Sequence, residues 1–227
     1  MSTIEADAIE DTHATHYSIK NLTLGDVQRT LNLREIEDLS FFEEYQDEPL
    51  ELAENDRHFL DELRKDLRQM QKYPRHEEIV KMFALAPVLR LAGLARYPFF
   101  PQAEYIIEID LSYEDRDEEA VVIRGRIDIL VSHENLWAIV IETKRSSSSV
   151  LEAIPQTLTY MMASKEKNFP IYGLCTNGTD FIFIKLVKGE VNQYALSDPF
   201  SIYRNAHNEL YDVVNILKHL GAIVTQN

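Results

Sequence analysis

Three ionisable side chains within one apolar stretch carry the chemistry that this chain offers. Residues 125–131 and 136–144 are two runs dense in branched apolar side chains, yet they contain Asp128, Glu142 and Lys144. Burial of such groups is costly unless something pairs them. Two carboxylates that can converge, with an ammonium two residues beyond one of them, indicate a site for a divalent metal ion and a phosphate.

The alternation of side chains along a strand predicts how these groups meet. Glu142 and Lys144 project from one face, whereas the side chain of Thr143 points away. Asp128, on the preceding strand, comes within reach of Glu142 if the register aligns the two strands. With the main-chain carbonyl of Thr143, the two carboxylates would form a hard oxygen site suited to Mg²⁺ or Mn²⁺. Lys144 would then orient or deprotonate the attacking water and neutralise charge on phosphorus. The alternative is a buried ion-pair network without a catalytic role.

The surrounding elements predict an α/β fold. Extended runs predict strands over residues 104–113, 120–131, 136–144, 171–176 and 180–187. Helical periodicity predicts helices over residues 53–70, 76–92, 150–164 and 202–220. Short links predict antiparallel neighbours, and Asn177-Gly178 predicts a hairpin turn. Pro87 is expected to kink its helix or to break it. The order of elements favours a central mixed sheet flanked by helices.

These residues resemble the PD-(D/E)XK nuclease superfamily, which has the restriction-endonuclease-like fold. Its pattern is an Asp near the end of one strand and Glu-X-Lys on the next, supplied here by Asp128 and by Glu142 to Lys144. Ile127, rather than Pro, precedes the Asp. The resemblance covers roughly residues 75–220 and implies an αβββαβ core with Mg²⁺- or Mn²⁺-dependent hydrolysis of phosphodiester bonds, above all in DNA.

A second motif narrows the resemblance to one branch of nucleases. Residues 155–160 resemble the Gln-x-x-x-Tyr motif of nucleases related to the endonuclease domain of type I restriction motor subunits. No motor segment is present, so a free-standing restriction-type nuclease domain is expected. Gln156 and Tyr160 share a helical face opposite the apolar stripe. The resemblance implies that they position Lys144 or contact a phosphate; the alternative is solvated helix surface.

Further residues are weaker candidates. The superfamily often adds a Glu from the first core helix to the metal site. The expected apolar face of the 76–92 helix consists of Ile79, Met82, Phe83, Ala86 and Leu89. Glu78 lies nearer than Glu77 to this face, so Glu78 is preferred, although it could be only a helix N-terminal charge. Arg126 and Arg145 are candidates for phosphate contacts, and Arg126 shares a strand face with Asp128. Both could instead be partners of nearby charges.

Composition and charge limit the function classes. The net charge of −15 opposes unaided DNA binding, but residues 1–70 hold 18 acidic and 7 basic residues, whereas residues 121–227 hold 10 of each. The single cysteine, Cys175, excludes an internal disulfide and a thiolate metal cluster, and is expected to be a buried thiol. The sequence contains neither an apolar run long enough for a membrane span nor a signal-peptide pattern, so a cytoplasmic location is expected.

The chain is expected to have three parts. Residues 1–15 are predicted to be a disordered tail, residues 16–73 an acidic helical extension, and residues 74–227 the nuclease-like domain. The acidic extension is a candidate surface for homodimerisation or for a protein partner. It therefore leaves a second function open: a catalytically silent nuclease-fold module that acts in protein–protein assembly or regulation.

Overall fold

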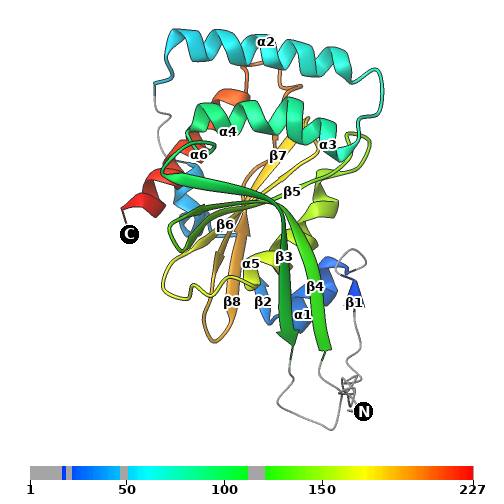
Figure 1. Ribbon diagram of the computed structural model, residues 1–227, viewed down its shortest axis with the longest axis vertical. Coiled ribbons are helices and arrows are strands. Elements are labelled where there is room, and N and C mark those ends of the chain that lie inside the picture. Colours follow the sequence, from blue (N-terminus) through cyan, green and yellow to red (C-terminus); the bar gives the residue numbers. More distant parts are fainter. Residues whose placement is uncertain (1–16, 19–21, 47–50, 112–120, 227) are drawn as a thin grey trace, which may run out of the picture.

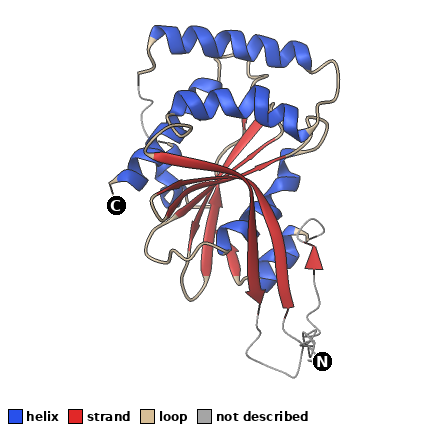
Figure 2. Ribbon diagram, in the orientation of Figure 1, coloured by secondary structure: helices blue, strands red, loops and turns tan. Residues whose placement is uncertain are grey.

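A central sheet with helices on both faces forms the molecule (Figures 1 and 2). The computed structural model describes residues 17–18, 22–46, 51–111 and 121–226, so the predicted tail lies outside the described residues. The strands are β1 (Tyr17–Ser18), β2 (Leu33–Glu35), β3 (Phe99–Leu111), β4 (Val121–His133), β5 (Leu136–Thr143), β6 (Ile171–Thr176), β7 (Asp180–Val187), β8 (Asn192–Leu196) and β9 (Phe200–Ser201). The helices are α1 (Leu24–Thr30), η2 (Leu39–Tyr45), α2 (Glu54–Met70), α3 (Glu77–Val80), η3 (Lys81–Leu85), α4 (Ala86–Ala92), η4 (Val150–Ala153), α5 (Ile154–Met162) and α6 (Leu210–Thr225).

The predicted fold class is confirmed. The sheet runs β1-β4-β5-β6-β7-β8-β2, with β3 on β4 and β9 on β7. The strands β3, β4 and β5 are antiparallel neighbours, and α5 then crosses over so that β6 lies parallel to β5. The hairpin of β6 and β7 turns at Gly178, whose φ of +81° suits glycine. Together, α4, β3, β4, β5, α5 and β6 make the αβββαβ core.

Two hydrophobic cores lie on the two faces of the sheet. We call them the first core, under α2, α3–α4 and α6, and the second core, under α1 and α5. Along β5, Ile139 and Ile141 belong to the first core and Val140 belongs to the second. Because strand side chains alternate, Glu142 continues the Val140 face and points toward α5.

The N-terminal part of the chain is not wholly helical, in contrast to the prediction. The strands β1 and β2 join the sheet parallel to β4 and β8. The predicted long helix is confirmed as α2, where Arg64 and Arg68 donate to the carbonyl of Ile202 at 2.8 and 2.7 Å. The domain boundary at residue 73 stays a prediction. Of the helices in the described ranges, none has the length and apolar character that a membrane crossing requires.

The last helix begins later than predicted. Residues 192–196 and 200–201 form β8 and β9, which the sequence analysis missed, and α6 starts only at Leu210. The main-chain N–H of Ile202 donates to Thr179 at 2.9 Å, and its carbonyl accepts from α2. Ile202 therefore lies in a loop that is bonded to the β6–β7 hairpin. Its side chain is fully buried, which is why the sequence pattern resembles the apolar face of a helix here.

The helix predicted over residues 76–92 consists of three segments. The π-helical segment η3 separates α3 from α4 and precedes Pro87, which has no N–H for a regular helical hydrogen bond. The chain stays helical through Pro87, and the irregularity predicted there takes the form of the π-helical segment before it rather than a break. The predicted apolar face is largely wrong, because Met82 and Phe83 are 56% and 43% exposed, although Leu89 is buried. The buried residues of this helix are Val80, Ala84, Leu85, Val88, Leu89 and Ala92.

The close packing of α5 on β6 yields a first prediction. A Cβ at Gly173 would lie 2.8 Å from Met161 Sδ and 2.9 Å from Thr157 Cγ2. Gly173→Ala is therefore expected to lower the free energy of unfolding by about 1–3 kcal/mol, the usual cost of overpacking, as measured by urea denaturation. Gly25→Ala is the control, because its nearest contact would be Thr23 Oγ1 at 3.9 Å. Equal stability of the two variants would show that α5 can shift freely.

Candidate active site

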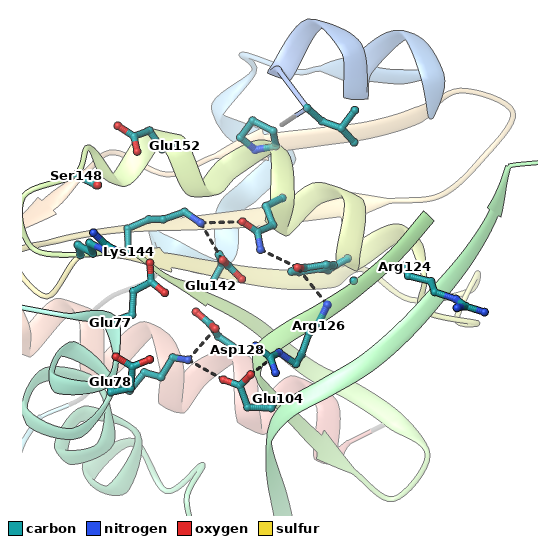
Figure 3. A pocket seen from close by; sticks show the side chains of 17 residues that line it. Glu77, Glu78, Glu104, Arg124, Arg126, Asp128, Glu142, Lys144, Ser148 and Glu152 are labelled. Atoms are coloured by element: carbon teal, nitrogen blue, oxygen red, sulfur yellow. Dashed lines mark hydrogen bonds and ion pairs between the residues drawn. The ribbon is translucent and has the colours of Figure 1, made fainter. Parts of the chain in front are cut away.

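A pocket of about 770 Å³ opens where β4, β5, α3 and α5 meet. Asp128, Glu142 and Lys144 all line it, and Figure 3 shows their side chains directed into the same space. The other lining residues are Leu22, Glu77, Glu78, Lys81, Glu104, Arg124, Gly125, Arg126, Arg145, Ser148, Glu152, Pro155, Gln156 and Tyr160. The predicted site residues thus share one cavity, with Thr143 buried beside it.

Asp128 lies where β4 separates from β5. The ladder between these strands ends at the pair Ile129 and Ile141, and β1 pairs with β4 further back, at residues 123–124. Beyond that end, Asp128 Oδ2 accepts hydrogen bonds from Thr143 N at 2.8 Å and Thr143 Oγ1 at 2.5 Å. The carboxylate thus satisfies an N–H that a neighbouring strand would otherwise bond. The carbonyl of Thr143 as a metal ligand stays a prediction.

Lys144 is held from two directions. Its Nζ donates to Glu142 Oε1 at 2.9 Å and to Gln156 Oε1 at 2.7 Å. Gln156 Nε2 in turn donates to the hydroxyl of Tyr160 at 2.7 Å. The same hydroxyl also accepts a hydrogen bond from Arg126 N at 3.4 Å. Gln156 and Tyr160 are only 6% and 2% exposed, so the alternative of solvated helix surface is wrong. A direct contact of Tyr160 with DNA stays a prediction.

Lys81 and Glu104 also line the site, although the sequence patterns do not predict them. Lys81 Nζ lies 2.8 Å from Asp128 Oδ1 and 3.1 Å from Glu104 Oε1. Glu104 Oε2 lies 2.5 Å from Arg126 Nε. The β3–β4 register pairs Ala103 with Ile129 and Tyr105 with Ile127, so Glu104 lies opposite Asp128 between these two pairs. Glu104 could be found only from the register of β3 on β4, and Lys81 only from the true buried face of its helix.

The backbone at Glu104 has an unusual conformation. Its φ is +56°, in the left-handed region that a residue with a side chain rarely adopts. Both β3 and β4 bend strongly along their length (Figure 1). On β4, residues two apart would normally share one face of the sheet. Ile129 instead packs against the first core and Ile127 belongs to the second, so the strand is irregular at Asp128, between them. The carboxylates of Glu104 and Asp128, which lie at this bend, both line the pocket.

Both glutamates of the first core helix line the pocket, but they differ in burial. Glu77 is half-buried, and its charge contributes to the raised pKa of Glu142. Glu78, the residue preferred from the sequence, is exposed. The sequence favours Glu78 because it lies near a predicted apolar face that includes Met82, but Met82 is exposed. Glu77 is thus the better enclosed of the two, and Glu78 as a metal ligand stays a prediction.

Burial dominates the electrostatics of Glu142. Its loss of solvent, and then the nearby charge of Asp128, raise the pKa of Glu142 to about 8, although Lys144 acts to lower it. For Lys81, burial acts to lower the pKa, but hydrogen bonds and charges of Asp128 and Glu104 outweigh it and raise the pKa. The two lysines therefore partly neutralise carboxylates that would otherwise repel one another.

The residues fit a hard divalent cation. Glu142 Oε2 is buried and has no hydrogen-bond partner among the residues that the structure describes. Such an unpaired carboxylate oxygen, with Asp128 in the same pocket, is a donor set that Mg²⁺ or Mn²⁺ prefers. Within the described residues, no group of three or more His, Cys, Asp and Glu side chains is already arranged to hold a metal ion. The ammonium groups of Lys81 and Lys144 contact the two carboxylates instead.

Most basic side chains around the pocket have acidic partners. The lining contains six acidic and five basic residues. Arg124 lies 2.9 Å from Glu108, and Arg126 contacts Glu104. Arg145 is exposed, and it is the one basic residue of this lining without an acidic partner in the described part of the chain. The pocket therefore carries little free positive charge.

Comparison with known proteins identifies one family. A family model described as the PD-(D/E)XK nuclease superfamily matches residues 16–211. Among solved structures, a fragment described as an HsdR subunit of a type I restriction enzyme from Vibrio vulnificus YJ016 matches with 18% sequence identity and a TM-score of 0.38. That match covers 48% of this chain and 21% of the other. No curated protein matches the chain.

The raised pKa of Glu142 gives a pH-dependent prediction. An ordinary Glu ionises near 4.5, whereas Glu142 in the folded state ionises at about 8. Between these values the folded state binds more protons than the unfolded state, so the free energy of unfolding falls as pH rises. Without divalent ions, Glu142→Gln is therefore expected to be more stable than wild type at pH 8 by several kcal/mol, and by much less at pH 4.

Urea denaturation at a series of pH values measures this difference. Glu190→Gln, in an exposed turn, is the control and should follow the wild-type curve. Parallel curves for wild type and Glu142→Gln between pH 4 and pH 9 would contradict a raised pKa at this position.

Proposed function

Because the chain belongs to the PD-(D/E)XK nuclease superfamily, we propose that it is a nuclease that hydrolyses phosphodiester bonds of DNA with a divalent metal ion. The observation that carries this proposal is the convergence of Asp128, Glu142 and Lys144 in one pocket. These three positions supply the Asp and the Glu-X-Lys of the superfamily pattern. The proposed ion is Mg²⁺ or Mn²⁺, since the available donors are oxygens.

Asp128 and Glu142 are the proposed metal ligands. The carbonyl of Thr143 and a glutamate of the first core helix, Glu78 or the better enclosed Glu77, would complete the set. Support comes from the buried Oε2 of Glu142, which has no hydrogen-bond partner in the described ranges and which a cation would satisfy. When bound there, the ion would polarise a phosphate oxygen and lower the pKa of a water molecule.

Lys144 is proposed to act on the phosphate and the attacking water. Its side chain is only 16% exposed, and its ammonium has two fixed acceptors, Glu142 and Gln156. A preorganised cation of this kind stabilises charge that develops on phosphoryl oxygens without further reorganisation. Gln156 is a positioning residue, because it holds Lys144 and is itself held by Tyr160.

Arg126 and Arg145 are proposed to contact the nucleic-acid backbone. Arg145 supports this role best, because it is exposed at the rim and has no acidic partner in the residues described. Arg126 would have to leave or share its contact with Glu104. With so few free cations, affinity for DNA is expected to be modest and to fall steeply with salt.

A second candidate is a catalytically silent module that binds a protein partner. The observation in its favour is that both lysines in the pocket are already paired with the carboxylates. Under this alternative, the acidic N-terminal part, with 18 acidic and 7 basic residues over residues 1–70, would form the interaction surface.

Nuclease activity is tested directly on plasmid DNA. Supercoiled and linear DNA, with an RNA arm, are incubated with the protein and Mg²⁺ or Mn²⁺, and products are separated on gels. Asp128→Asn, Glu142→Gln and Lys144→Ala are each expected to lower the cleavage rate at least about 100-fold, the usual effect of removing a group that stabilises the transition state. Lys65→Met, on the exposed side of α2, is the control and should cleave like wild type.

Two outcomes would contradict the proposal. One is cleavage that persists unchanged in the three site variants, which would point to a contaminant. The other is a lack of cleavage of every substrate, together with no Mn²⁺ binding that depends on Glu142. The second outcome is what the silent module predicts.

A further inference from the structure

Asp128 has one oxygen left for a cation, and Lys81 already contacts it. Oδ2 accepts both the N–H and the hydroxyl of Thr143, at 2.8 and 2.5 Å. Oδ1 lies 2.8 Å from Lys81 Nζ. The Lys81 side chain is 17% exposed and that of Asp128 is 13% exposed, so this ion pair is largely shielded from water. A divalent ion that binds Asp128 therefore meets an ammonium group in the same place.

Glu104 gives the same ammonium a second acceptor. It lies opposite Asp128 in the β3–β4 pairing, and its Oε1 is 3.1 Å from Lys81 Nζ. Like charges placed directly across two strands destabilise a sheet unless a cation lies between them. Lys81 supplies that cation, while Arg126 Nε contacts the other oxygen of Glu104 at 2.5 Å. Glu104 is thereby held beside Asp128, independently of what Asp128 itself binds.

We propose that Lys81 occupies the cation position at Asp128 until a divalent ion replaces it, and that Glu104 retains the Lys81 ammonium after this exchange. The inference rests on the proposed function, because it assumes that Asp128 and Glu142 bind the ion. Lys81 is then a positioning residue that sets the metal concentration at which the site fills.

The physical basis of the exchange is repulsion between two cations in a poorly solvated pocket. An ammonium and a divalent ion that share one carboxylate repel each other more strongly where water is excluded. The flexible four-carbon stem of lysine lets its ammonium move without displacing the helix. Because Glu104 is already within hydrogen-bond distance, the ammonium can leave Asp128 and still keep an anionic partner.

The test is Mn²⁺ binding by isothermal titration calorimetry at constant ionic strength. Lys81→Met is expected to bind Mn²⁺ on the order of tenfold more tightly than wild type, because the competing charge is gone. Lys65→Met makes the same change in net charge on the exposed surface of α2 and should bind like wild type. Lys81→Gln is a second neutral variant, expected to change affinity in the same direction, for the case that Lys81→Met does not fold.

A double-mutant cycle separates the role of Glu104 from its bare charge. Glu104→Gln is expected to weaken Mn²⁺ binding several-fold, because Lys81 then has only Asp128 as its partner. In the Lys81→Met background this effect should largely disappear. An equal loss in both backgrounds would overturn the role of Glu104 as acceptor, since Glu104 would then attract the ion directly.

The outcomes distinguish this inference from the proposed function. If Mn²⁺ binding depends on Glu142 but is unchanged or weakened by both Lys81 variants, the exchange is wrong and the proposed metal site stands. If neither wild type nor the Lys81 variants bind Mn²⁺ through Glu142, the metal-dependent function fails and the exchange fails with it. Tighter binding in both Lys81 variants supports the exchange.

Discussion

Beyond Ile129 and Ile141, the strands β4 and β5 part, and the Asp128 carboxylate accepts the hydrogen bonds of Thr143 that a strand partner would otherwise receive. The opening between the two strands becomes the pocket, and the free edge of β4 is taken up again by β1. Without an acceptor at this point, Thr143 would leave a buried N–H unpaired. The same carboxylate thus maintains the sheet and forms one wall of the candidate active site.

The site is nearly balanced in charge without any metal ion. Lys81 lies against Asp128, and Lys144 lies against Glu142, so each buried carboxylate has one ammonium. This pairing offsets part of the cost of burying the carboxylates, although the pKa of Glu142 stays raised at about 8. Lys144 depends further on α5, whose close approach to Gly173 of β6 brings Gln156 and Tyr160 behind it.

Local sequence patterns were enough for part of the site and not for the rest. Asp128, Glu142 and Lys144 could be predicted because strand periodicity and one short connection place them together. Lys81 could not, because a π-helical segment begins at this residue and the apolar face of its helix was assigned one position away from the real one. Glu104 required the register of β3 on β4, which depends on packing across the whole sheet rather than on nearby residues.

The left-handed backbone at Glu104 lowers the stability of the fold while it places a charged group in the candidate site. A glycine would adopt this conformation at little cost, whereas a side chain with a Cβ strains the bend. The strand therefore carries a penalty for placing a carboxylate between Lys81 and Arg126. Selection for thermal stability alone would favour replacing Glu104 by glycine. Such a thermostable variant would lose backbone strain at the same residue that balances the charges of Lys81 and Arg126.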